Sequence, residues 1–150
     1  MERIATWAIL KDWETELEIL AINTHFDHKG DLARVESAKL LKRKITDLGA
    51  NLPVILTGDF NLTPEAAGIQ TIIKSDGAQT LKDAKLMAEV TYGPDWTTCG
   101  FDNRPFEVRK TIDYIFVKGI SRVSRFAVFA EMLDNLYLSD HCPVFAQLVF

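Results

Sequence analysis

The sequence has 150 residues, of which 47% are hydrophobic and 25% charged, so it has enough apolar side chains to form the core of a single domain. This composition excludes a disordered chain, and the apolar runs are too short for a membrane-spanning helix. A formal net charge of -4 argues against a protein that holds a long polyanion by electrostatics alone.

The first elements along the chain are predicted to be two strands, a helix and a third strand. Residues 4–10 and 17–24 are apolar, β-branched runs separated by a polar stretch, which predicts a hairpin or adjacent strands. After Asp31, which is placed to cap a helix, apolar residues recur every three or four positions up to Gly49. Residues 53–57 are a short apolar run typical of a strand buried on both faces. This order predicts an α/β arrangement.

The rest of the chain is predicted to add one helix, a long irregular segment and three strands. Thr63 and Pro64 form a typical helix start, and that helix is expected to stop near residues 75–77. Residues 78–110 lack a clear period, and so long an irregular stretch is more often a functional loop. The last three strands are expected at residues 112–118, 122–130 and 143–150.

Polar residues gather at the ends of the predicted strands. They form four clusters: Asn23-Thr24-His25, Gly58-Asp59-Phe60-Asn61, Thr111-Ile112-Asp113-Tyr114 and Ser139-Asp140-His141. In open α/β sheets, ligands bind just beyond the strand ends, so these clusters are expected to converge on one site. Carboxylates that hold Mg²⁺, imidazoles that transfer protons and an amide that orients water suit metal-assisted hydrolysis of a phosphate ester.

Each cluster also has a structural explanation. A Gly-Asp pair after a strand is common in turns, and His25 and His141 are equally typical of structural histidines whose ring nitrogens are hydrogen-bonded. Asp113 is harder to explain in this way, because a carboxylate within an apolar strand costs several kcal/mol unless it is paired. The combination, rather than any one member, favours a catalytic site.

Taken in order, the motifs N-T-H-F-D-H, G-D-F-N, T-I-D-Y-I-F and S-D-H-C-P-V resemble those of the endonuclease/exonuclease/phosphatase superfamily. The resemblance covers nearly the whole chain and implies an α/β (α+β) fold. It predicts a mixed β-sheet with helices on one face, as half of a DNase-I-like four-layer α/β/β/α sandwich. Residues 1–150 are expected to be the C-terminal portion of that domain.

The resemblance also implies a metal-dependent phosphoesterase that uses Mg²⁺ or Mn²⁺. Asp59 is expected to position or activate the attacking water, with Asn61 beside it. Asp113 is expected to orient His141, and His25 to donate to the phosphate. The implied metal site draws on Asp59, Asn61 and Asp140.

Family members carry an N-terminal half with an asparagine and a metal-binding glutamate, and no glutamate near the start of this chain has a matching context. The resemblance therefore implies weak metal binding and little activity in the isolated chain. The alternative function is a catalytically inactive binding or assembly module that retains the fold.

A small or lipid-linked phosphoester is favoured over duplex DNA as the substrate. A histidine at the position of His25 is typical of the family members that such a substrate implies, and the chain is acidic. Trp96, Arg104 and Arg109 are candidate substrate contacts, although Trp96 could equally pack the loop down. A homodimer, or the missing N-terminal half, is expected to cover the sheet face opposite the helices. The apolar residues expected on that face are Ile19, Ile22, Ile55, Ile115, Val128 and Val144.

Overall fold

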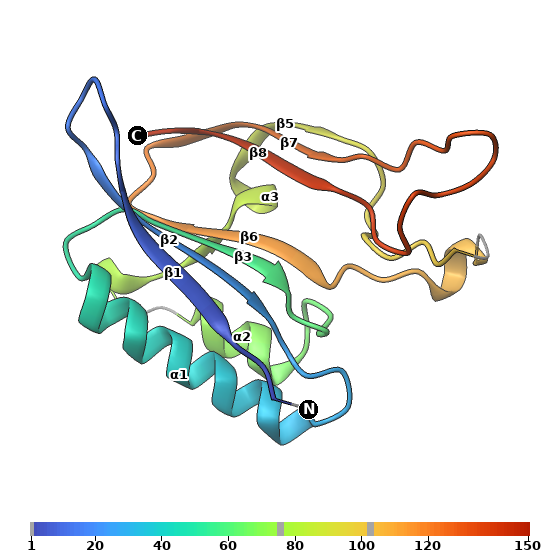
Figure 1. Ribbon diagram of the computed structural model, residues 1–150, viewed down its shortest axis with the longest axis horizontal. Coiled ribbons are helices and arrows are strands. Elements are labelled where there is room, and N and C mark those ends of the chain that lie inside the picture. The colour runs from blue at the N-terminus through green and yellow to red at the C-terminus, as the bar shows by residue number, and fades with distance from the viewer. Residues whose placement is uncertain (1, 75–76, 102–103) are drawn as a thin grey trace.

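A computed structural model describes residues 2–74, 77–101 and 104–150. These residues form a five-stranded sheet in the order β1-β2-β3-β6-β4 and a three-stranded sheet in the order β5-β7-β8. Figure 1 shows the smaller sheet stacked over one face of the larger, with helices α1 and α2 on the other face. The predicted α/β class and the helices on one face are confirmed, but a second sheet lies within this chain.

The N-terminal elements follow the sequence pattern closely. Strands β1 (Ala5–Lys11) and β2 (Glu18–His25) form the predicted antiparallel hairpin. Helix α1 (Asp31–Gly49) then crosses to β3 (Val54–Asp59), which pairs with β2 in parallel. The predicted strand-helix-strand unit is therefore confirmed.

The two helix starts differ from the prediction. Gly30, not Asp31, is the N-cap residue of α1, and the Asp27 carboxylate accepts the Gly30 N–H at 2.6 Å. Helix α2 (Ala67–Ile73) begins after a turn in which the Ala66 N–H donates to the Thr63 carbonyl. Thr63 and Pro64 thus start a turn that precedes the helix. The predicted stop at residues 75–77 falls partly outside the described residues.

The segment predicted to be irregular contains several short elements. They are η1 (Gly77–Gln79), β4 (Lys82–Asp83), α3 (Ala84–Met87), β5 (Ala88–Tyr92) and η2 (Phe106–Val108). Strand β5 pairs in parallel with β7 at the edge of the smaller sheet. Four of its five residues are exposed, so it lacks the alternation of buried and exposed side chains that identifies a half-buried strand.

The three C-terminal strands are confirmed as β6 (Asp113–Lys118), β7 (Arg122–Val128) and β8 (Val144–Val149). Strand β6 pairs with β3 in the larger sheet, whereas β7 and β8 pair in the smaller one. The chain therefore passes from one sheet to the other between β6 and β7.

Two apolar cores result from this layering. The first packs α1 and α2 against the larger sheet around Leu20, Leu56 and Phe116, and the second lies between the sheets around Val123 and Phe126. Within the described residues, no helix has both the length and the apolar character that crossing a membrane requires.

The six residues expected on an open sheet face do not share one environment. Ile22 belongs to the helix-side core, and Ile115, Val128 and Val144 belong to the core between the sheets. Only Ile19 and Ile55 remain half-buried on the uncovered part of the larger sheet, because alternation along β2 and β3 points them away from the helices. The smaller sheet takes the place predicted for an absent partner over Ile115, and its own Val128 and Val144 contribute to the same core.

Candidate active site

Strand register brings the first polar residues together. His25 lies opposite Asp59 where β2 and β3 pair, and Asp59 lies opposite Asp113 where β3 and β6 pair. These three residues therefore occupy the same edge of the larger sheet on three adjacent strands. The predicted convergence follows directly from the pairing of β2, β3 and β6.

Gly58 makes this close packing of strands possible. Its φ is +151°, and a Cβ atom at this position would lie 1.9 Å from the Thr24 carbonyl oxygen. Only glycine tolerates such an approach between β2 and β3. The residue before Asp59 is thus determined by backbone contact with the strand that carries His25.

Three groups hold the Asp59 carboxylate. Its Oδ1 accepts the Asn61 backbone N–H at 2.7 Å, and its Oδ2 lies 3.2 Å from both the Asn61 side-chain nitrogen and His25 Nε2. Asn61 has a φ of +50°, and its amide also donates to the Phe26 carbonyl. Burial raises the pKa of Asp59, and the nearby Asp113 carboxylate adds to that rise, although the Asn61 N–H opposes it.

Asp113 and His141 form the predicted pair. His141 Nδ1 lies 2.9 Å from Asp113 Oδ2 and 3.1 Å from Oδ1, and because a carboxylate only accepts, Nδ1–H is the donor. This hydrogen bond raises the pKa of His141, while burial acts against it. The bond fixes the ring so that Nε2 is the nitrogen left for proton transfer.

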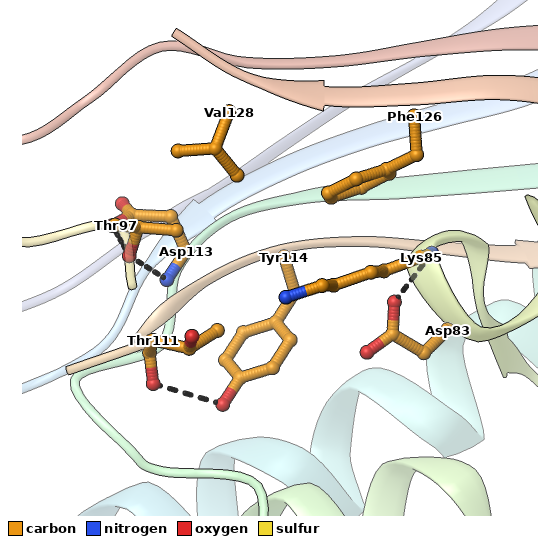
Figure 2. A pocket seen from close by; sticks show the side chains of 8 residues that line it. All are labelled: Asp83, Lys85, Thr97, Thr111, Asp113, Tyr114, Phe126 and Val128. Atoms are coloured by element: carbon orange, nitrogen blue, oxygen red, sulfur yellow. Dashed lines mark hydrogen bonds between the residues drawn. The ribbon is translucent and has the colours of Figure 1, made fainter. Parts of the chain in front are cut away.

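Thr97 supports this pair and was not identified from the sequence. Its hydroxyl donates to Asp113 Oδ2 at 2.6 Å and accepts the backbone N–H groups of Ile112 and Asp113. Figure 2 shows Thr97 beside Asp113. A small cavity of about 10 Å³ lies behind them between the sheets, with room for at most about one water molecule. The Asp113 carboxylate is therefore backed by protein on that side.

His141 reaches the site because its segment pairs with the segment that contains Thr97. Thr98 and His141 form an isolated antiparallel bridge, and the Cys142 N–H donates to the Thr97 carbonyl at 2.7 Å. Cys99 and Cys142 are buried beneath this bridge as free thiols, and burial raises the pKa of Cys142 to about 12. The Cys142 thiol is therefore protonated, and both buried cysteines pack as small apolar side chains.

Asp59, Asp113 and His141 form a candidate metal cluster. Each offers a ligand atom, and these atoms lie within 4.8 Å of one another. Two neighbouring carboxylates suit a hard divalent cation, whose charge would offset both their repulsion and the burial of Asp59. Asp140 is exposed and lies outside this cluster, so its predicted role in the metal site remains a prediction.

The residues predicted to contact the substrate differ in how far they are buried. The Arg109 guanidinium lies 4.1 Å from the Trp96 ring centre and 4.4 Å from that of Phe106, and it is 9% exposed. Its Nε donates to the carbonyl of Arg104, whose side chain is exposed. These contacts pack Trp96 and Arg109 into the segment after β5. A substrate role for Trp96, Arg104 and Arg109 remains a prediction.

The site opens into a groove of about 440 Å³ between the two sheets. Asp59, Asp113 and Pro143 are among its lining residues. A phosphate group in this groove would lie between β3 and β6 on one side and the start of β8 on the other.

A family model described as "Endonuclease/Exonuclease/phosphatase family" matches residues 5–141. No curated protein matches the chain. The matched range includes the elements that carry His25, Asp59, Asp113 and His141.

Several solved structures share the fold. An endonuclease/exonuclease/phosphatase from Bacteroides vulgatus is 41% identical with a TM-score of 0.90, over 97% of this chain and 55% of that one. The Bacteroides thetaiotaomicron mannosyl-6-phosphatase is 36% identical with a TM-score of 0.86, over 99% and 57%. The human Nocturnin catalytic domain, at 21% identity and a TM-score of 0.68 over 98% and 54%, shows the fold alone. The chain spans about half the length of these relatives.

Proposed function

The chain belongs to the endonuclease/exonuclease/phosphatase family, and from this premise we propose that it hydrolyses a phosphoester with a divalent cation, Mg²⁺ or Mn²⁺. The observation that carries the proposal is the convergence of Asp59, Asp113 and His141 within 4.8 Å. Asp59 offers a carboxylate to the cation, and the Asp113–His141 pair beside it supplies the proton-transfer group.

The residues have complementary roles in this proposal. The Asp59 carboxylate, with Asn61 beside it, positions the attacking water and accepts its proton. Asp113 orients His141 through Nδ1, so that His141 Nε2 exchanges a proton with the reacting group. His25 donates to a phosphoryl oxygen. A bound cation would polarise the phosphoryl oxygens, with Asp59, Asn61 and Asp140 as its proposed ligands.

The proposed substrate is a phosphate ester of a small molecule, with a sugar phosphate as the first choice. The 36% identical neighbour with a solved structure is a mannosyl-6-phosphatase, and the net charge of -4 disfavours a long nucleic acid. A lipid-linked phosphoester has the same reacting group and is the next substrate to test.

The test is metal-dependent hydrolysis by the 150-residue chain. Because no glutamate near its start matches the one that the family resemblance implies, we expect weak Mg²⁺ binding and slow turnover of glucose 6-phosphate and p-nitrophenyl phosphate. Chelation and His141→Ala should each remove that turnover. Thermal shift with Mg²⁺ measures cation binding independently of turnover.

Three outcomes are distinguishable. Turnover that survives both chelation and His141→Ala would contradict the proposal. Cation and phosphate binding without any turnover would favour the inactive binding module. Rates of an ordinary enzyme, about 1–10³ s⁻¹, would show that all the required metal ligands lie within these 150 residues.

We also propose that a second copy of the chain, or a separate segment that supplies the N-terminal half, covers the open part of the larger sheet. A groove of about 270 Å³ on this sheet includes Trp7, Ala21 and Ile55 among its lining residues. Trp7 is 51% exposed. Light scattering during size-exclusion chromatography tests the dimer, and a monomer at tens of micromolar would contradict it.

A further inference from the structure

We propose that a second groove, beside His141, binds the sugar ring of the substrate while the phosphate occupies the Asp59–His141 site. This inference rests on the proposed phosphoesterase function. The groove has a volume of about 230 Å³ and adjoins the site, because His141 lines it and Pro143 lines both this groove and the one at Asp59. Its other lining residues include Phe129, Glu131, Tyr137, Leu138, Ser139 and Pro143.

The groove is fixed in position relative to the site. The Phe129 N–H donates to the Pro143 carbonyl at 2.9 Å, which joins the end of β7 to the start of β8. The Ser139 hydroxyl accepts the His141 backbone N–H at 3.2 Å. These bonds hold Phe129, Pro143 and Ser139 in fixed positions beside His141.

One wall of the groove is apolar and exposed. Leu138 is 82% exposed and Phe129 is 41% exposed. The preceding turn is a tight hairpin, because Leu133 and Leu136 exchange two backbone hydrogen bonds of 2.9 Å. Exposed apolar side chains that line one groove are typical of a binding surface. The C–H face of a sugar ring would cover them.

The polar residues of the groove select an uncharged partner that carries hydroxyl groups. Glu131 Oε1 accepts the Tyr92 hydroxyl at 3.2 Å, which positions the carboxylate and leaves Oε2 for another donor. Ser139 adds a hydroxyl, and none of the described residues that line the groove is a lysine or an arginine, although Arg109 donates to the Tyr137 hydroxyl. A carboxylate without a cation repels a second phosphate and accepts hydrogen bonds from sugar hydroxyls.

The size of the groove favours one ring. Pockets for drug-sized ligands are about 300–1,000 Å³, and 230 Å³ lies below that range. Two acyl chains need far more room, whereas a single hexose fits. An unsubstituted aromatic ring would fit by size but would leave Glu131 without a donor from the ligand.

The test follows backbone amide NMR shifts of the 150-residue chain in Mg²⁺ during titration with three probes. They are inorganic phosphate, phenyl phosphate and glucose 6-phosphate. All three should shift amides around Asp59 and His141, and glucose 6-phosphate should also shift those of Leu138 and Ser139. Glu131→Ala should weaken the binding of glucose 6-phosphate about tenfold and leave that of inorganic phosphate unchanged.

A matched pair of variants tests the apolar wall. Leu138→Ala should also weaken the binding of glucose 6-phosphate. Leu86→Ala, which removes an equally exposed leucine on α3, should leave that binding unchanged. Glucose 6-phosphate that binds no more tightly than inorganic phosphate, without shifts at Leu138, would overturn the groove assignment but not the phosphoesterase proposal. Tighter binding of phenyl phosphate that is insensitive to Glu131→Ala would overturn the sugar assignment. No shift near Asp59 with any probe would overturn both proposals.

Discussion

The two halves of the site are constructed differently. The β3 half, defined as His25, Asp59 and Asn61, is placed by strand register and by the close approach at Gly58, and its imidazole is exposed. In the β6 half, defined as Asp113, His141 and Thr97, register places Asp113, and side-chain hydrogen bonds between segments far apart in the chain hold His141 and Thr97 against it. Backbone pairing therefore determines one half, and a hydrogen-bond network orients the other.

This difference indicates where each half is vulnerable. The β3 half should fail when its backbone packing fails, and it should tolerate loss of the exposed His25 ring. The β6 half should fail when one side chain is removed, because each partner orients the next.

The largest expected effect is on turnover. His141→Ala should reduce metal-dependent hydrolysis by about 10²–10⁴-fold, because it removes the proton-transfer group. His25→Ala should cost about tenfold, because it removes one hydrogen bond to the phosphate. Both rates are to be measured on the same substrate with the same Mg²⁺ concentration, and equal losses would contradict the distinction between the halves.

The next effect is on folding of the β3 half. Gly58→Ala should lower the free energy of unfolding by about 3–5 kcal/mol, because the new Cβ meets the Thr24 carbonyl and φ is unfavourable for alanine. Gly77→Ala is the control. Its φ is +61°, but apart from its chain neighbours no described atom lies within 4 Å of the new Cβ, so it should cost only about 1–2 kcal/mol. Urea denaturation measures both variants. Similar losses would show that backbone angle, rather than contact with β2, determines the requirement at Gly58.

The matching prediction for the β6 half concerns Thr97. Thr97→Val keeps the shape of the side chain but removes the bond to Asp113 and the acceptor for two N–H groups, so it should cost about 1–3 kcal/mol. Thr98→Val, at the neighbouring and less buried hydroxyl, should cost less. The His141 ring resonances should also shift in Thr97→Val. Unchanged resonances would mean that Thr97 does not orient the pair.

The same difference explains what the sequence could and could not predict. His25, Asp59 and Asp113 were placed correctly because each stands at the end of a strand with a clear apolar pattern, and register then brings them together. Thr97 gave no signal, because it lies outside any helix or strand and its partner is 16 residues away. Hydrophobic periodicity predicts strands and helices, but it does not predict hydrogen bonds between side chains of distant segments.

The predictions about the fold that were wrong have a related cause. Strand β5 was missed because its residues are mostly exposed, so no alternation marks it. Without β5 the smaller sheet could not be predicted, and residues such as Ile115 and Val128 were expected on an open face instead of in the second core. The helix start predicted at Thr63 and Pro64 was also wrong, because the residues that favour a helix start also favour a turn, and here they begin a turn.

The smallest expected effect compares how ionisation contributes to stability in the two halves. The pKa of Asp59 is raised by burial, so the folded state binds its proton more tightly than the unfolded state does. Its contribution is fully present below the unfolded pKa of about 3.9 and is lost as pH rises through the raised value. Asp59→Asn should therefore increase stability slightly at pH 7, by less than the loss in Thr97→Val, while removing hydrolysis.

His141 acts in a different pH window, which provides the control. Its pKa is also raised, chiefly by the hydrogen bond to Asp113, so its stabilisation is present below about pH 6.5 and is lost as pH rises through the raised value. In urea denaturation from pH 4 to pH 9, the stability of Asp59→Asn should differ from that of wild type mainly at the acid end. A smaller change is expected above pH 6.5, because the Asp59 charge also raises the pKa of His141. Asp113→Asn should instead flatten the decline above pH 6.5. Asp59→Asn could instead be less stable than wild type at pH 7 without a cation. The hydrogen bonds from Asn61 and His25 to the Asp59 carboxylate would then outweigh the cost of burying it. In that case side-chain bonds would hold the β3 half as firmly as they hold the β6 half.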